Sequence, residues 1–61
     1  MRNGTPNFQP ARLVEARDAR GLTQVALGEL INRMSSNVSR WESGGQSPEP
    51  DAVDALARAL N

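Results

Sequence analysis

Cysteine, histidine, lysine and tyrosine are all absent from this chain of 61 residues. Without cysteine there can be no disulfide, and without cysteine or histidine an ordinary zinc site is excluded. A chain this short lies near the lower limit for folding without such supports. We therefore expect one small domain whose stability comes from a compact helical core, from oligomerisation or from a larger parent chain.

Long apolar runs are also missing. No stretch approaches the roughly 20 apolar residues that a membrane-spanning helix needs, and no charged-then-apolar leader opens the chain. The lack of cysteine is compatible with a reducing compartment. The sequence thus predicts a soluble, cytoplasmic protein with no membrane partner.

Side chains suited to catalysis are scarce as well. With no histidine, no cysteine and no convergent pair of carboxylates, the chain has nothing to act as nucleophile or general base. The metallopeptidase motif HExxH is also missing. We expect no catalytic residue, no metal site and no cofactor, so the protein is not expected to be an enzyme.

The formal net charge is zero, which by itself argues against binding to nucleic acid. The charges are nevertheless segregated, giving +2 for residues 1–20, 0 for residues 21–46 and −2 for residues 47–61. One face of the protein could therefore still be positive. All seven basic residues are arginine, which suits forked recognition of phosphate or guanine, although genome composition explains it equally well.

The first seven residues are polar and contain glycine and proline, so we expect a flexible tail over residues 1–7. Arg2 in this tail could enter a minor groove, but simple disorder is the favoured interpretation. A helix should then occupy residues 10–20. Pro10 suits its first position, and Gly21 suits a left-handed cap at its end.

Two further helices are expected on either side of a short turn. Thr23 is a good N-cap, and Asn32 is the best non-glycine residue for a left-handed turn, so a helix should span residues 23–31. The next should span residues 35–43. Its buried side should consist of three apolar residues at positions i, i+4 and i+7, namely Met34, Val38 and Trp41.

A last helix should occupy residues 50–60, after a loop rich in glycine and proline. Pro50 suits its first turn, because the residue before a proline is biased away from the helical conformation. Its apolar stripe has the full i, i+3, i+4, i+7 pattern: Val53, Leu56, Ala57 and Leu60. No alternating β-branched run predicts a strand, so the expected fold class is all-α with four helices.

The outer face of the helix expected at 35–43 is unusually polar. It consists of Ser35, Ser36, Asn37, Ser39 and Arg40. Serine and asparagine are poor helix formers, and a solvent-facing helix would more often carry Glu and Lys. Short side chains let a helix sink into the major groove of DNA, which is about 12 Å wide. Arginine can fork onto guanine, asparagine can bridge adenine and serine can bond several edges, so this face is expected to read bases.

The order of these parts resembles a known family. The stretch LTQVALGELINRMSSNVSRWESG, residues 22–44, is similar without a gap to the helix-turn-helix of the Cro and phage-repressor type, the XRE family. The family's leucine-threonine-glutamine opening corresponds to Leu22–Gln24, its small residue between the two helices to Gly28, and its tryptophan-glutamate-x-glycine close to Trp41–Gly44. Resemblance covers about residues 8–60. It implies a compact lambda-repressor-like DNA-binding domain of four helices, to which such domains commonly add a fifth.

The resemblance also implies roles for individual residues. Base contacts would come from Ser35, Ser36, Asn37 and Arg40. Phosphate contacts would come from Thr23, Gln24, Arg33 and Ser39, with Gln24 helped by the N-terminus of its helix. Asn37 and Ser39 could equally reach a phosphate or lie at the rim, and Arg33 could instead pack its stem over the turn. The alternative for every one of these contacts is a plain solvated surface.

Three further positions have structural interpretations. Arg17 and Glu42 match a family ion pair that links the first helix to the end of the third. Trp41 is expected in the core and not as a base-stacking residue, since proteins that read duplexes seldom stack bases. Met34 stands where the family has a serine or threonine cap, so Ser35 could become the cap instead.

These features predict sequence-specific binding to double-stranded DNA by a bacterial or phage transcription regulator, either a repressor or an antitoxin-type autoregulator. A homodimer would bind a palindromic operator with half-sites one helical turn apart. A toxin or a C-terminal domain would be a further partner. The alternatives are a protein-interaction module that keeps the fold without binding DNA, which the neutral charge favours, and an N-terminal targeting domain of a longer protein.

Overall fold

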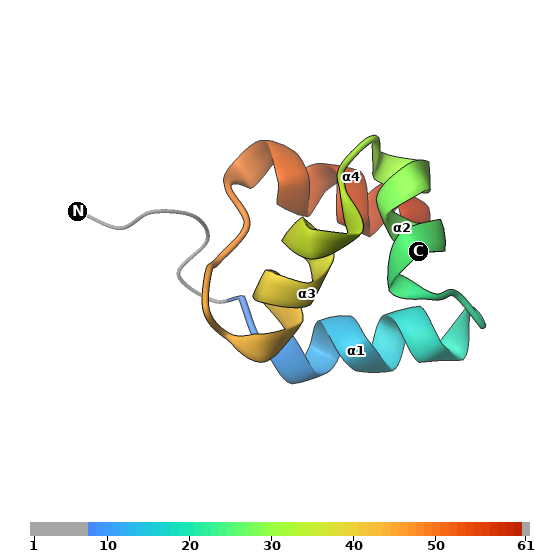
Figure 1. The fold of residues 1–61 in the computed structure, drawn as a ribbon, viewed down its shortest axis with the longest axis horizontal. Helices are drawn as coiled ribbons and strands as arrows, with labels where there is room; N and C mark the ends of the chain where they lie inside the picture. Colours follow the sequence, from blue (N-terminus) through green and yellow to red (C-terminus); the bar gives the residue numbers. More distant parts are fainter. Residues whose placement is uncertain (1–7, 61) are drawn as a thin grey trace.

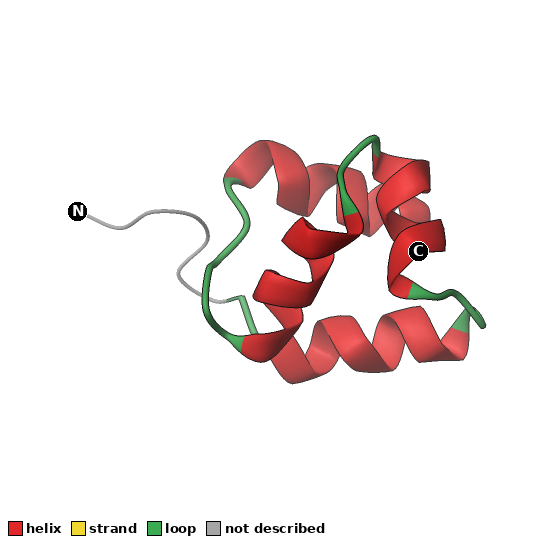
Figure 2. Ribbon diagram, in the orientation of Figure 1, coloured by secondary structure: helices red, strands yellow, loops and turns green. Residues whose placement is uncertain are grey.

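The computed structural model describes residues 8–60, and within this range it contains helices and loops but no strand (Figures 1 and 2). The four helices in this described part of the chain are α1 (Pro10–Ala19), α2 (Gln24–Ile31), α3 (Ser35–Ser43) and α4 (Pro50–Leu60). The predicted all-α class is confirmed. The tail expected at residues 1–7, with Arg2, lies outside the described residues. No helix within residues 8–60 is long and apolar enough to cross a membrane.

Helix α2 has a side-chain cap at its start and a left-handed residue at its end. The Thr23 Oγ1 accepts a hydrogen bond from the backbone N–H of Ala26 at 3.0 Å. Asn32 has φ 60° and ψ 43°, as predicted for the turn, and the next N–H, that of Arg33, donates to the Gly28 carbonyl at 2.8 Å. Since the chain reverses within residues 32–34, α3 follows α2 almost immediately.

The turn between α2 and α3 is tight because Gly28 has no side chain. A Cβ built on Gly28 would lie 2.5 Å from the backbone carbonyl oxygen of Arg33. Ordinary van der Waals contact would need about 1 Å more. The small residue that the resemblance places between the two helices is therefore confirmed at Gly28, where the turn leaves no room for a side chain.

Met34, and not Ser35, is the N-cap of α3. Its backbone is extended, with φ −79° and ψ 151°, and its side chain makes no capping hydrogen bond. The predicted burial of Met34 is wrong, because 72% of its surface is exposed. Helical spacing does not apply to a residue that precedes the helix, so Met34 does not share the face of Val38 and Trp41.

We expect Met34→Ser to stabilise the domain by about 1 kcal/mol, because serine at an N-cap accepts a hydrogen bond from the first turn and methionine does not. The exposed thioether takes little buried surface with it when it is removed. Urea denaturation followed by circular dichroism measures the change, with Met34→Ala as the control for loss of the side chain. Equal unfolding free energies for the serine and alanine variants would contradict this expectation.

The core lies where the four helices meet. Helix α3 packs against α1 and α2, and α2 packs against α4 (Figure 1). The buried apolar residues are Leu13, Leu27, Ile31, Val38, Trp41, Ala52 and Leu56. Trp41 is 2% exposed, which confirms its expected place in the core and removes it as a base-stacking residue.

The buried face of α4 differs from the predicted stripe. Ala52 and Leu56 are buried and Leu60 packs against the core, but Ala57 is exposed and Val53 is half-buried. Because α4 has alanines on more than one side, its sequence is compatible with two different buried faces. The spacing of apolar residues alone therefore does not determine which face packs against α2. The helix still covers the end of the core, and its acidic residues are left outside.

Candidate nucleic-acid interface

The outer face of α3 is centred on Ser36, Ser39 and Arg40. Successive residues of an α-helix turn by about 100°, so these three lie opposite the buried Val38 and Trp41. All three are exposed. The face predicted from the sequence therefore exists as a surface of short hydroxyl groups around one long arginine.

Ser35 and Asn37 stand on the two flanks of this outer face. Each is half-buried, whereas the three central residues are exposed. Asn37 borders an open hollow at the turn, lined by Gly28, Glu29, Asn32, Arg33, Met34 and Asn37. Of the expected base-contacting residues, Ser36 and Arg40 are thus central, while Ser35 and Asn37 could reach a ligand only from the sides.

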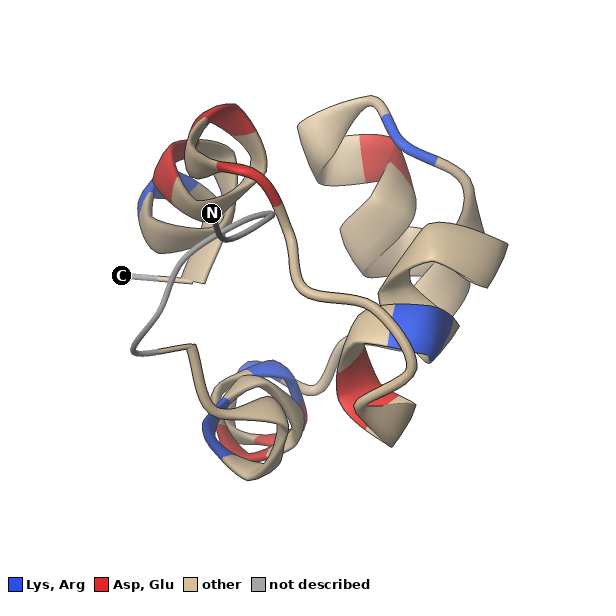
Figure 3. Ribbon diagram, turned by 90° about the vertical axis from the view of Figure 1, so that its left-hand side faces the viewer, with Lys and Arg blue, Asp and Glu red and all other residues tan. Residues whose placement is uncertain are grey.

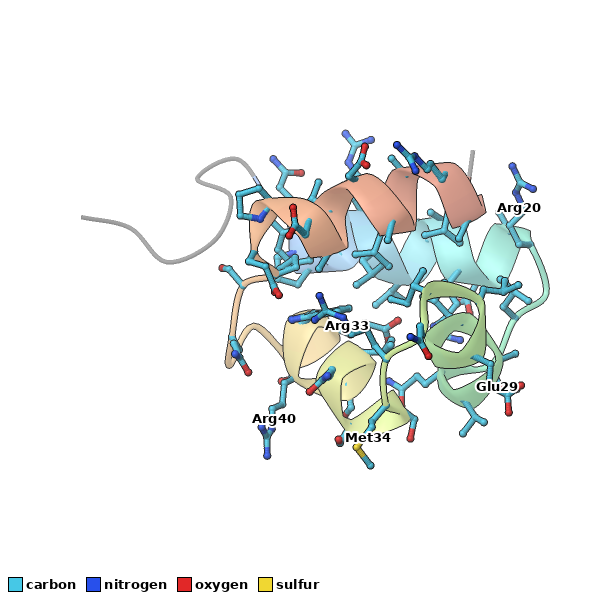
Figure 4. The ribbon with its side chains drawn as sticks, turned by 90° about the horizontal axis from the view of Figure 1, so that it is seen from above. Arg20, Glu29, Arg33, Met34 and Arg40 are labelled. Atoms are coloured by element: carbon cyan, nitrogen blue, oxygen red, sulfur yellow. The ribbon has the colours of Figure 1, made fainter. Side chains whose placement is uncertain are left out.

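Arg40 projects from α3 on the side that faces away from α4, and Met34 projects on the same side (Figure 4). The acidic excess of residues 47–61 is carried by α4 and the loop before it (Figure 3). The acids of α4 and of this loop are therefore on other elements than Arg40, which projects away from α4. An anionic ligand on the outer face of α3 would approach Arg40 without approaching the acids of α4.

Ser43 also belongs to this face, although it is not among the residues predicted from the sequence. It lies three and four residues after Arg40 and Ser39, the spacing of neighbours on one helix face. Its hydroxyl donates to the Arg40 carbonyl at 3.1 Å and accepts from the Gly45 N–H at 3.4 Å. Ser43 therefore closes the end of α3, and the helical spacing from Ser36 could have identified it.

Arg17 and Glu42 form a forked ion pair between α1 and α3. The Arg17 Nε lies 2.6 Å from the Glu42 Oε2, and the Arg17 Nη2 lies 3.2 Å from the Glu42 Oε1. The Arg17 Nη1 donates to the Leu22 carbonyl at 2.7 Å. Since the side chains are only 15% and 7% exposed, this pair is shielded from water and joins α1 to α3 and to the loop before α2.

Gln24 is the third member of this cluster. Its Nε2 donates to the Glu42 Oε1 at 3.0 Å, a contact that the sequence analysis did not foresee. This contact uses one of the two hydrogens of the Gln24 side-chain amide and leaves the other available to a ligand. The expected phosphate contact of Gln24 would have to use that second hydrogen or the backbone N–H groups at the start of α2, which have no partner within the helix.

The pKa of Glu42 reflects these contacts. Burial alone would raise the pKa, but the hydrogen bonds from Arg17 and Gln24 and the charge of Arg17 together lower it below its usual value of 4.5. The carboxylate is therefore ionised at neutral pH, as a bidentate partner of an arginine must be.

Arg33 is held by Glu49. The Arg33 Nη2 lies 2.9 Å from the Glu49 Oε2, and the Arg33 side chain lies between α3 and α4 (Figure 4). The hydrogen bond from Arg33, together with the backbone N–H of Glu49, lowers the pKa of that carboxyl. For Arg33 to reach a phosphate it would have to leave this partner.

A family model described as a helix-turn-helix domain matches residues 11–61. The chain belongs to this helix-turn-helix family. The family is related to XRE-type domains, so the resemblance inferred from residues 22–44 is confirmed at that level. Neither the curated proteins nor the solved structures contain a significant match to the chain.

Helix-turn-helix domains place their second helix in the major groove and rest the first on the backbone. In this domain the first helix of the motif is α2 and the second is α3. Family membership supports DNA binding and a role in transcription regulation. The Ser36, Ser39 and Arg40 face therefore lies on the second helix of the helix-turn-helix.

Proposed function

We propose that this helix-turn-helix domain binds double-stranded DNA in a sequence-specific manner and regulates transcription, with α3 in the major groove. The observation that carries the proposal is the exposed face of α3, where Ser36 and Ser39 surround Arg40. A face of this composition adds little to helix stability, since serine is a poor helix former. It offers hydrogen-bond donors and acceptors of the kinds that pair with base edges.

Each expected contact has a place in the proposed complex. Arg40 forks onto the O6 and N7 of a guanine, while Ser35, Ser36 and Asn37 bond neighbouring base edges. Phosphate contacts come from Thr23 and Gln24 at the start of α2 and from Ser39, because helix N-termini favour anions. Arg33 joins these contacts if phosphate replaces Glu49 as its partner.

The finer part of the proposal concerns assembly and regulation. A homodimer on a palindromic operator, with half-sites one helical turn apart, would present two copies of α3 to successive major grooves on one side of the duplex. Such a protein would act in the cytoplasm as a repressor or as an antitoxin-type autoregulator, with a toxin or a C-terminal domain as a further partner and without catalysis.

The proposal is tested by selection of duplexes from a random pool at two salt concentrations, followed by binding measurements on variants. We expect Arg40→Ala to weaken binding to the enriched duplex by about 10- to 100-fold and to relax the preference at one base pair. Binding to a scrambled duplex should change far less. Fluorescence anisotropy of labelled duplexes gives both affinities.

The matched control is Arg58→Ala, which removes the same charge from α4, where the arginine is 81% exposed and pairs with Asp54. Arg58→Ala should leave sequence preference unchanged. Equal losses on enriched and scrambled duplexes for Arg40→Ala would remove Arg40 from base reading. An enriched sequence that is not palindromic would remove the two-fold dimer.

A protein-interaction module is the second candidate. It is favoured by the neutral net charge and by the ion pairs that neutralise Arg17 and Arg33. The salt dependence of binding distinguishes the two candidates. The affinity for DNA falls steeply between about 50 and 200 mM salt, and more steeply the more phosphates the protein neutralises, whereas an apolar protein contact changes little. A folded domain that enriches no duplex at either salt concentration would favour this candidate.

A further inference from the structure

Met34 is an exposed apolar side chain at the start of the proposed recognition helix. It is 72% exposed, more than Val25 at 57% or Leu30 at 60%, the other large apolar residues that are exposed among residues 8–60. It projects on the same side as Arg40, away from α4 (Figure 4). Met34 therefore occupies the surface that the proposed complex turns toward DNA.

Folding does not explain a methionine at this position. The N-cap of α3 has the extended backbone that suits serine, threonine or aspartate, and methionine leaves the cap without a side-chain hydrogen bond. With most of its surface in solvent, the side chain also adds little to the core. The residue therefore lowers helix stability without a gain in packing.

The spacing along α3 places Met34 over a different base pair from Arg40. Arg40 lies five residues, or about 7.5 Å of helix rise, from Ser35, the first residue of α3, and Met34 lies one extended residue before Ser35. This separation corresponds to two or three base-pair steps of about 3.4 Å. The N-terminal end of a recognition helix is also the part that approaches base edges most closely.

The chemistry of the side chain limits what it can contact there. A thioether is a poor hydrogen-bond acceptor, so Met34 cannot read the donor and acceptor pattern of a base. The C5-methyl group of thymine is the apolar group on the floor of the major groove. Methionine is unbranched and adapts its shape to such a small apolar surface.

We propose that Met34 is a specificity-determining residue that contacts the C5-methyl group of a thymine, two or three base-pair steps from the pair read by Arg40. This inference rests on the proposed function. It adds an apolar contact to a face that otherwise reads DNA by hydrogen bonds.

The test replaces each thymine of the selected duplex, one at a time, by deoxyuridine, which lacks only the C5-methyl group. At one position the wild-type protein should lose about fourfold in affinity, the effect of one buried methyl group. Met34→Ala should bind the thymine duplex about as weakly as the wild type binds the uracil duplex, and should lose nothing further when the methyl group is removed.

The control is Leu30→Ala, which removes a similarly exposed apolar side chain from α2. Leu30 lies about 160° around α2 from Gly28, the residue that faces the turn, so it points away from α3. This variant should retain the full methyl effect. Met34→Ser gives a second control. This variant is expected to be more stable than the wild type, so if it no longer distinguishes thymine from uracil, the loss cannot be due to unfolding.

The outcomes distinguish this inference from the function on which it rests. If no duplex is enriched, the proposed function fails and the role of Met34 fails with it. If a duplex is enriched and depends on Arg40, but removal of every methyl group costs the same in the wild type and in Met34→Ala, the role of Met34 alone is overturned.

Discussion

Gly28→Val is expected to destabilise the domain by about 3 kcal/mol, because the new side chain would overlap the backbone of the turn between α2 and α3. Even a single Cβ would lie 2.5 Å from the Arg33 carbonyl oxygen, and a backbone atom cannot move aside as a flexible side chain can. A domain of this size has a total stability of roughly 3–9 kcal/mol. Much of the population should therefore be unfolded.

Unfolding is measured through the fluorescence of Trp41, the single tryptophan, which is 2% exposed in the folded domain. Gly45→Ala is the matched control, since a Cβ on Gly45 would meet its nearest atom at an ordinary 3.6 Å. Gly28→Ala should fall between the two, because the smaller clash is partly offset by a gain of about 1 kcal/mol in helix propensity. A stable Gly28→Val variant would show that the two helices can separate.

The second large effect is expected from Glu42→Ala, with a loss of about 2–3 kcal/mol. Removal of one partner from a partly buried ion pair costs more than the pair contributes, because the remaining charge stays largely away from water. Arg17, 15% exposed, would keep the Leu22 carbonyl and a 3.4 Å contact with the exposed Asp18. Gln24 would lose its acceptor as well. The measurement is again urea denaturation followed through Trp41.

Asp54→Ala is the control for an ion pair on the surface. Its partnership with Arg58 spans i to i+4 on α4, and the two side chains are 63% and 81% exposed. Pairs of this kind contribute only about 0.3–0.5 kcal/mol. If Glu42→Ala cost no more than Asp54→Ala, the cluster around Glu42 would not be a structural element of the fold.

The effect of Glu42 should also depend on pH. The pKa of Glu42 is lower in the folded protein than its usual value of 4.5. The ionised carboxylate therefore stabilises the fold at pH values above 4.5, and this contribution is lost as the pH falls through the pKa of the folded state. The difference in unfolding free energy between the wild type and Glu42→Gln should be constant near neutral pH and shrink below about pH 4.5. Glu49, whose pKa is also lowered, is present in both proteins and cancels from the difference.

Residues with distinct backbone preferences allowed much of the fold to be predicted from sequence. Pro10 and Pro50 begin helices, Asn32 ends α2 in a left-handed conformation, and Gly21 has the positive φ predicted for it after α1. Such effects act within one or two residues, so they can be read without knowledge of the tertiary structure. Trp41 and Val38 were likewise identified as core residues, since both lie well inside a helix with a single apolar stripe.

The wrong prediction for Met34 and the unpredicted partners of Gln24 and Arg33 have one cause, which is that a local pattern does not determine tertiary contacts. Met34 has the spacing of a buried residue, but it lies before the first helical residue and points to solvent. The partners of Gln24 and Arg33 lie 18 and 16 residues further along the chain, so only the packing of the helices reveals them. The contacts of the α3 face with DNA remain predictions, because they depend on a ligand.

The hydrogen bond between Gln24 and Glu42 has a consequence for the entropy of binding. A free glutamine on a protein surface samples many rotamers, and fixing it in a complex costs about 0.5–1.5 kcal/mol. In this domain the amide is already held at 3.0 Å from a carboxylate that is itself clamped by Arg17. The rotamer freedom of Gln24 is therefore lost when the protein folds, and a ligand that meets the start of α2 finds this side chain preorganised.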